Sequence, residues 1–194
     1  MRQLPESKRL FVAIPFVPDA SFTDKWQRLR RCTNKTDRAV WVNPSLFHLT
    51  VKFLGETDAA RLPEISRALA KVTARCEVFS LLLDKVGAFG SRYCPRVLWL
   101  GTERLPEGLL RLHKETDAAL ARLGFPPTFG NFVCHLTMAR IQRIESKNFF
   151  WEQVEACNGL FSERVEAKEM VLYESVLRKG CPPQYLVCER FPLP

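Results

Sequence analysis

Apolar and polar residues follow two patterns along the chain, one typical of strands and one typical of helices. Period-two alternation and short apolar runs bounded by Pro or Gly indicate strands, whereas apolar residues three and four positions apart indicate amphipathic helices. We therefore predict strands at residues 9–16, 47–53, 79–90, 96–102, 133–141, 163–177 and 185–190. We predict helices at residues 19–31, 58–76, 105–123 and 146–157, the first of them followed by a polar turn. This mixture of strand hairpins and covering helices indicates the α+β class.

A four-residue motif occurs twice, as HLTV at residues 48–51 and as HLTM at residues 135–138. The two copies are 87 residues apart, about half the chain, and each lies on a predicted strand between two helices. No linker or low-complexity segment divides the 194 residues. We therefore predict one bilobal domain over residues 1–194, built from two pseudo-symmetric lobes that each contribute an equivalent strand.

The period of two along a strand places His48 and Thr50 on one face. The opposite face, which ends at Phe53, is apolar and is expected to pack in the core. In the second copy His135 and Thr137 share a face in the same way. If the two polar faces meet, two imidazoles and two hydroxyls converge on one cleft.

Two histidines are suited to displacement at phosphorus, because near neutral pH one accepts a proton while the other donates one. Threonine hydroxyls can donate hydrogen bonds to the phosphate oxygens. This chemistry requires neither a metal nor a cofactor, and we expect none. A single His-x-Thr on a strand is more often structural, but the two copies contain two of only three histidines in the chain. The third, His113, lies in a helix rich in charged residues and is expected to be solvated.

The net charge of +8, from 29 Lys and Arg against 21 Asp and Glu, favours a polyanionic partner such as RNA or DNA. The alternative is that the charge only keeps the protein soluble. The basic residues are scattered, with small clusters at Arg28, Arg30, Arg31, Lys35 and Arg38, and at Arg140, Arg143 and Lys147.

The remaining composition excludes several classes of protein. With 46% hydrophobic and 26% charged residues, the chain is neither disordered nor collagen-like. The seven cysteines form no CxxC pair and have no histidine at zinc-site spacing, so we expect reduced and mostly buried thiols. No apolar run approaches the ~18 residues of a membrane span, and the apolar run near the start is broken by Pro15. We therefore expect a cytoplasmic protein without membrane association.

The paired HxTx motifs are similar to those of the 2H phosphoesterase superfamily. The stretches RLFVAIPF, FHLTVKFLGE, RVLWLG, HLTMAR and LYESVLRKG with a following Tyr extend the resemblance over nearly the whole chain. Within the superfamily, the chain most resembles the bacterial and archaeal RNA 2′,3′-cyclic phosphodiesterases, also described as 2′-5′ RNA ligases.

This resemblance implies antiparallel sheets that line a central cleft, with helices on the outer faces. It also implies hydrolysis of a terminal 2′,3′-cyclic phosphate to a 2′-phosphate, as part of RNA processing. Carried over, His48 donates a proton to the departing 3′ oxygen, His135 activates water, and Thr50 and Thr137 hold the phosphate. Ligation of 2′-5′ ends would be the reverse reaction. The implied partner is RNA with cyclic-phosphate or 2′-5′ ends, and we expect a monomer.

Two basic residues near the motifs are less clearly placed. Arg140 matches an arginine often found after the second motif, but strict alternation places it opposite His135. Contact with phosphate would therefore require a bulge or the end of the strand, and a structural ion pair is equally open. Lys52 shares the face of His48 by alternation, and near the end of a strand it is expected to be solvated.

Two alternative functions are compatible with the same residues. The site could hydrolyse a small cyclic phosphate, such as a nucleotide or an ADP-ribose derivative, instead of an RNA end. The motifs could also grip phosphate without turnover, in a non-catalytic RNA-binding module.

Overall fold

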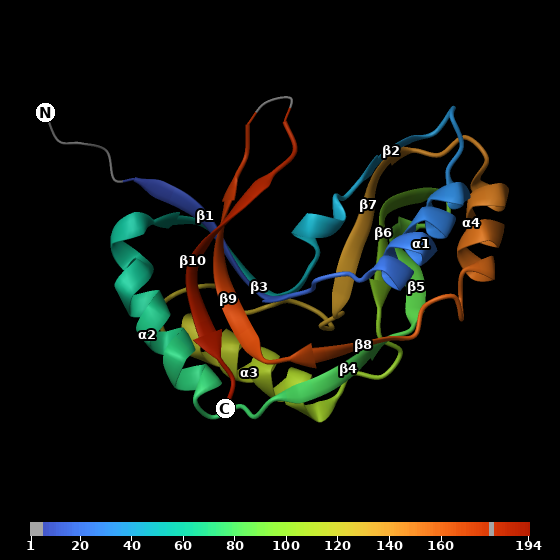
Figure 1. Cartoon of the computed structure of the whole chain (residues 1–194). Coiled ribbons are helices and arrows are strands. Elements are labelled where there is room, and N and C mark those ends of the chain that lie inside the picture. The colour runs from blue at the N-terminus through green and yellow to red at the C-terminus, as the bar shows by residue number, and fades with distance from the viewer. Residues whose placement is uncertain (1–5, 179–180) are drawn as a thin grey trace, which may run out of the picture.

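The computed structural model describes residues 6–178 and 181–194 (Figure 1). Its strands are β1 (Ser7–Pro15), β2 (Arg38–Trp41), β3 (His48–Asp58), β4 (Phe79–Leu83), β5 (Lys85–Ser91), β6 (Cys94–Gly101), β7 (His135–Arg143), β8 (Glu163–Ala167), β9 (Glu169–Val176) and β10 (Gln184–Pro192). Its helices are α1 (Ala20–Leu29), α2 (Leu62–Thr73), α3 (Glu107–Ala121) and α4 (Lys147–Ala156). Single 3-10 turns lie at Arg30–Cys32, Pro44–Leu46 and Ala59–Arg61.

The predicted α+β class with two lobes is confirmed. One lobe contains β10, β9, β1 and β3 in that order, and the other contains β7, β6 and β5, with β2 added to β7. All strand pairs are antiparallel, and β3 meets β7 at a single residue pair, Leu49 with Leu136. A separate two-stranded sheet pairs β4 with β8. In Figure 1, α2 and α3 lie beside the first lobe and α1 and α4 beside the second.

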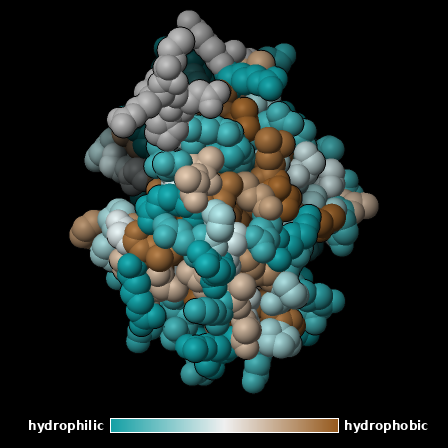
Figure 2. Space-filling model, turned by 90° about the vertical axis from the view of Figure 1, so that its left-hand side faces the viewer, coloured by the Kyte–Doolittle hydropathy of each residue, from teal (hydrophilic) through white to brown (hydrophobic). Residues whose placement is uncertain are grey.

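The helices form where apolar residues recur at helical spacing, and each buries one face. In α1, Phe22, Trp26 and Leu29 are buried, and the Asp19 carboxylate caps the helix by accepting a hydrogen bond from the Phe22 N–H at 2.7 Å. The outer side of α2 belongs to the face in Figure 2, where hydrophilic residues predominate and hydrophobic residues form small groups. None of the helices in the described residues is long and apolar enough to cross a membrane.

One turn prediction and two strand predictions were wrong. The segment predicted as a polar turn after α1 contains β2, which forms by pairing with β7 rather than through local hydrophobicity. The predicted strand 79–90 is divided at Asp84, whose carboxylate accepts a hydrogen bond from the Glu103 N–H at 2.9 Å. The predicted strand 163–177 is divided at Lys168, so that β4 and β8 pair with each other outside the main sheet. A period-two pattern identifies strands but does not reveal which partner each half will choose.

The seven cysteines are all free, but they are less buried than predicted. Cys32, Cys76 and Cys134 are buried and Cys157 is intermediate. The other three are exposed: Cys94, Cys181 and Cys188.

Candidate active site

A pocket of about 680 Å³ lies between the two lobes, and all five predicted site residues line it. His48 and Thr50 come from β3, whereas His135, Thr137 and Arg140 come from β7. The structure therefore brings the two motif copies together at one pocket, from strands that meet only at the residue following each histidine.

Each histidine is oriented by a backbone carbonyl two residues before it. His48 Nδ1 lies 2.8 Å from the Leu46 oxygen, and His135 Nδ1 lies 2.8 Å from the Val133 oxygen. Because a carbonyl oxygen only accepts hydrogen bonds, Nδ1 carries the hydrogen in both rings. In the neutral form this leaves a lone pair on Nε2, which is therefore the nitrogen available to exchange protons at both positions.

The pKa values of both histidines are lowered, chiefly because burial disfavours the charged imidazolium. The carbonyl hydrogen bonds oppose this effect, whereas the positive charge of Arg140 lowers both pKa values further. For His48, the second histidine adds a further lowering. Both imidazoles are consequently poised as neutral bases near pH 7 in the free protein.

Aromatic side chains that sequence reasoning did not assign to the site surround the two imidazoles. The His48 ring lies 4.9 Å from that of Phe11 and 5.1 Å from that of Tyr185, between centroids. The His135 ring lies 4.8 Å from Phe89 and 6.5 Å from Trp99. These residues come from β1, β10, β5 and β6, and no local pattern in the sequence shows that these strands meet. Phe11 and Trp99 lie in stretches shared with the resembling family, and Tyr185 follows another, so the resemblance was the available signal.

A bulge interrupts each motif strand three positions after its histidine. The register of β3 with β1 skips Val51, and the register of β7 with β6 skips Met138. The extra residue reverses the alternation of side chains beyond it. As a result, Phe53 and Arg140, each five positions after a histidine, both line the pocket. This is the bulge that a pocket-facing Arg140 required, and among the described residues Arg140 forms no ion pair.

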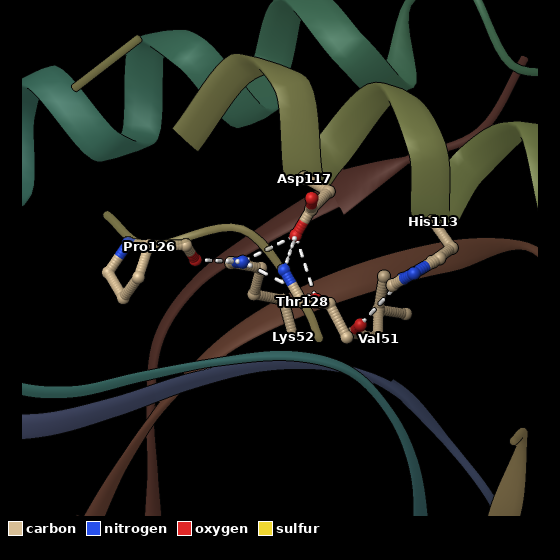
Figure 3. Close-up of polar contacts among 6 residues, drawn as sticks. All are labelled: Val51, Lys52, His113, Asp117, Pro126 and Thr128. Atoms are coloured by element: carbon tan, nitrogen blue, oxygen red, sulfur yellow. Dashed lines mark hydrogen bonds and ion pairs between the residues drawn. The ribbon is translucent and has the colours of Figure 1, made fainter. Parts of the chain in front are cut away.

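The same bulge overturns two expectations for β3. Phe53, predicted to pack in the core, is 64% exposed and lines the pocket. Lys52, predicted to be solvated, is only 4% exposed and forms an ion pair with Asp117 of α3 (Figure 3). Strict alternation failed at both residues because it assumes an uninterrupted ladder.

The buried Lys52 belongs to a polar network behind the sheet (Figure 3). Its Nζ donates to Asp117 and to the Pro126 carbonyl at 2.6 Å. The Asp117 carboxylate also accepts from the backbone N–H of Thr128 at 3.0 Å and from its hydroxyl at 2.8 Å. Burial acts to raise the pKa of Asp117, but the hydrogen bonds from Lys52 and Thr128 outweigh it and the pKa is lowered. The network joins β3 to the segment that leads into β7.

His113 is not solvated as expected. It is partly buried and forms a second hydrogen-bonded contact between α3 and β3. Its Nδ1 donates to the Val51 carbonyl at 3.0 Å, at the bulge of β3 (Figure 3). Its ring stacks on Phe132 with centroids 3.9 Å apart. Helix α3 therefore contacts both β3 and the segment that precedes β7.

Within residues 6–178 and 181–194, no group of three or more His, Cys, Asp or Glu is arranged to hold a metal ion. The pocket offers imidazole, hydroxyl and guanidinium groups for chemistry.

Comparison with known proteins finds similar sequences and structures. The family model described as LigT-like phosphoesterase matches the chain twice, at residues 17–99 and 100–182. The chain is 28% identical to the RNA 2′,3′-cyclic phosphodiesterase of Aquifex aeolicus over 184 residues, which cover 94% of this chain and 96% of the relative. It is 30% identical to the enzyme of that name from Geobacillus stearothermophilus over 189 residues, but the match spans only 56% of that longer relative. Among solved structures, E. coli LigT complexed with 3′-AMP superposes with a TM-score of 0.73 at 26% identity, over 97% of this chain and 99% of the other.

Proposed function

The chain belongs to the LigT-like phosphoesterase family, and from this premise we propose that it hydrolyses the 2′,3′-cyclic phosphate at an RNA end to a 2′-phosphate. The observation that carries the proposal is the pair of histidines in one pocket, each with Nδ1 fixed by a carbonyl and Nε2 left to exchange protons. The names of the relatives support the choice of substrate.

The proposed reaction is a displacement at phosphorus that uses one histidine on each side. Nε2 of His135 accepts a proton from water while the water oxygen forms a bond to phosphorus. The bond between phosphorus and the 3′ oxygen breaks, and protonated His48 gives its Nε2 proton to that oxygen. The products are a 2′-phosphomonoester and a free 3′ hydroxyl. His135 ends protonated and His48 neutral, and exchange with solvent restores both.

The other predicted residues hold the reacting group. The hydroxyls of Thr50 and Thr137 donate hydrogen bonds to the non-bridging oxygens, and the Arg140 guanidinium stabilises the negative charge that builds on them. The scheme assigns every proton transfer to side chains and calls for no metal ion. Binding of the phosphate anion raises the pKa of the nearby imidazoles, which allows His48 to carry the proton it donates.

Both lobes are needed in this scheme, and we therefore treat the chain as one bilobal functional unit. Each lobe supplies one histidine and one threonine of the same pocket. The reverse of the reaction joins a 2′-phosphate to a hydroxyl, which is how ligation of 2′-5′ ends would use the same residues.

The test is product analysis on a short RNA that ends in a 2′,3′-cyclic phosphate, in excess chelator. Native protein should form the 2′-phosphate, and His48→Ala and His135→Ala should each lower the rate by about 10²–10⁴-fold, the range of a general acid or base. His113→Ala is the matched control, because it removes the third histidine from outside the pocket, and it should retain most of the activity. RNA binding by the native protein without any product would overturn the catalytic proposal in favour of a binding module.

A further inference from the structure

A strongly basic groove borders the active-site pocket on the side of α1. Its volume is about 440 Å³, and its lining includes the cations Arg30, Arg31 and Lys35 together with Trp41. We refer to these four residues as the basic groove. The described residues that line it include no carboxylate. The groove gathers most of the first basic cluster of the sequence into one hollow.

Trp41 lines both the basic groove and the active-site pocket, so the two hollows adjoin each other at this residue. Its neighbour Val40 also lines the pocket and pairs with Arg140 across β2 and β7. A ligand that fills the pocket and extends past β2 at Trp41 is therefore next to the groove.

The cations of the groove are free to bind an anion. The Arg30 guanidinium lies 5.0 Å from the ring centroid of Trp26 and 5.8 Å from that of Trp41, so aromatic rings hold it in place. Arg31 and Lys35 are exposed. Within the described residues, none of the three cations forms an ion pair.

The acidic residue of the same turn, Asp37, lies outside the lining of the groove. The Asp37 carboxylate accepts hydrogen bonds from the backbone N–H groups of Asn34 and Glu145, both at 2.8 Å. These hydrogen bonds join the turn to the segment after β7, and among the described residues Asp37 forms no ion pair with the three cations.

We propose that the basic groove binds backbone phosphates of the RNA segment immediately 5′ of the cyclic terminus, an inference that rests on the proposed function. A 2′,3′-cyclic phosphate is a 3′ end, so the rest of the RNA leaves the pocket in the 5′ direction. A cationic groove beside aromatic side chains matches the way proteins bind single-stranded nucleic acid. The substrate class is then an oligonucleotide, because a cyclic mononucleotide has no phosphate to place in the groove.

The test compares two substrates and two charge-matched variants. The groove variant is Arg31→Gln/Lys35→Gln. The control is Arg67→Gln/Lys71→Gln, which removes the same charge from the exposed side of α2, on the far side of the molecule from α1 (Figure 1). We measure kcat/KM on a ten-nucleotide RNA with a cyclic terminus and on a 2′,3′-cyclic mononucleotide, at several salt concentrations.

The groove variant should lose about tenfold in kcat/KM on the oligonucleotide and less than twofold on the mononucleotide. Losing two phosphate contacts should also make the slope of log kcat/KM against log salt shallower by about 1.4, at about 0.7 per contact for a single strand. The control variant should change neither. An equal loss of kcat/KM on both substrates, or an equal loss in both variants, would refute phosphate binding by the basic groove. Either result would leave the proposed function intact.

Binding of the same RNA with a plain 3′ hydroxyl, followed by fluorescence anisotropy, tests the groove independently of turnover. The groove variant should bind about tenfold more weakly than the native protein, and the control should bind equally well. If the native protein hydrolyses neither substrate but shows this difference in binding, the proposed function fails and the groove stands. If the two variants bind the RNA equally well, the proposal that the basic groove binds RNA is refuted.

Discussion

The β3 half-site (His48, Thr50 and Phe53) and the β7 half-site (His135, Thr137 and Arg140) share a backbone geometry but differ in charge. In both, histidine Nδ1 lies 2.8 Å from a carbonyl oxygen, and a bulge follows three residues later. The residue that this bulge turns into the pocket is Phe53 on one side and Arg140 on the other. In the proposed mechanism, the duplicated scaffold would therefore provide proton transfer symmetrically, whereas stabilisation of negative charge would come from one side. This asymmetry would give a bound phosphate a preferred orientation.

The residue before each of these two differs as well. Lys52 and Ala139 are both buried behind the sheet. Lys52 is paired there because α3 presents Asp117 to it, whereas the small Ala139 needs no partner. The equivalent position thus holds a buried ion pair at Lys52 in one lobe and an apolar side chain, Ala139, in the other.

The largest expected effect separates Arg140 from its counterpart Phe53. Arg140→Gln should lower kcat/KM on the cyclic-phosphate RNA by about 10²–10³-fold, as expected when a charge-stabilising donor is lost. Phe53→Leu should cost less than tenfold. Arg140→Lys should recover part of the loss, because the charge returns without the two-pronged geometry. Equal losses at Phe53 and Arg140 would show that the half-sites are not asymmetric in charge stabilisation.

The buried ion pair between Lys52 and Asp117 in the first lobe should contribute more to stability than an exposed ion pair in the second lobe. Lys52→Met leaves Asp117 without its cation and should lower the free energy of unfolding by about 2 to 3 kcal/mol, below the 3–5 kcal/mol of a fully buried pair because Asp117 keeps Thr128. Arg143→Ala breaks the exposed pair with Glu145 and should cost less than about 1 kcal/mol. Urea denaturation followed by circular dichroism measures both, and similar losses would contradict the comparison.

The threonines should behave symmetrically. Thr50→Val and Thr137→Val each remove one hydrogen bond to a charged oxygen, and each should lower kcat/KM by about 10–100-fold. The measurement is steady-state kinetics on the cyclic-phosphate RNA, with Thr128→Val as a control outside the pocket. A loss at only one threonine would extend the asymmetry beyond Arg140.

The smallest expected effect is a displacement of the pH profile. The profile of kcat/KM reports the free protein, in which both histidine pKa values are lowered, so its centre should lie below pH 6.5. The profile of kcat reports the complex, in which the phosphate anion raises these pKa values, and its centre should lie at higher pH. Arg140→Gln removes a charge that lowers both pKa values and should move the kcat/KM profile upward. A downward movement would contradict the assigned cause.

The sequence predicted the four motif side chains but not the surfaces around them. His48, Thr50, His135 and Thr137 could be placed because their alternation holds up to the bulge. Beyond it, Lys52 and Phe53 were exchanged between core and pocket, since a bulge depends on the register with a neighbouring strand and not on local residue type.

The division of strands and the role of α3 were missed for the same physical reason. β2 and the breaks at Asp84 and Lys168 follow from pairing between segments distant in sequence. His113 has polar neighbours along its helix, yet its partners Val51 and Phe132 come from other elements. A helical pattern shows which positions face outward only when nothing else packs on them.

The single pairing of Leu49 with Leu136 between β3 and β7 has a mechanical consequence. These residues directly follow the two histidines, so the lobes are joined by strand pairing next to both imidazoles. A rotation of one lobe against the other about this pairing would move the two imidazoles little, because they lie beside it, and would move the more distant rim of the cleft further.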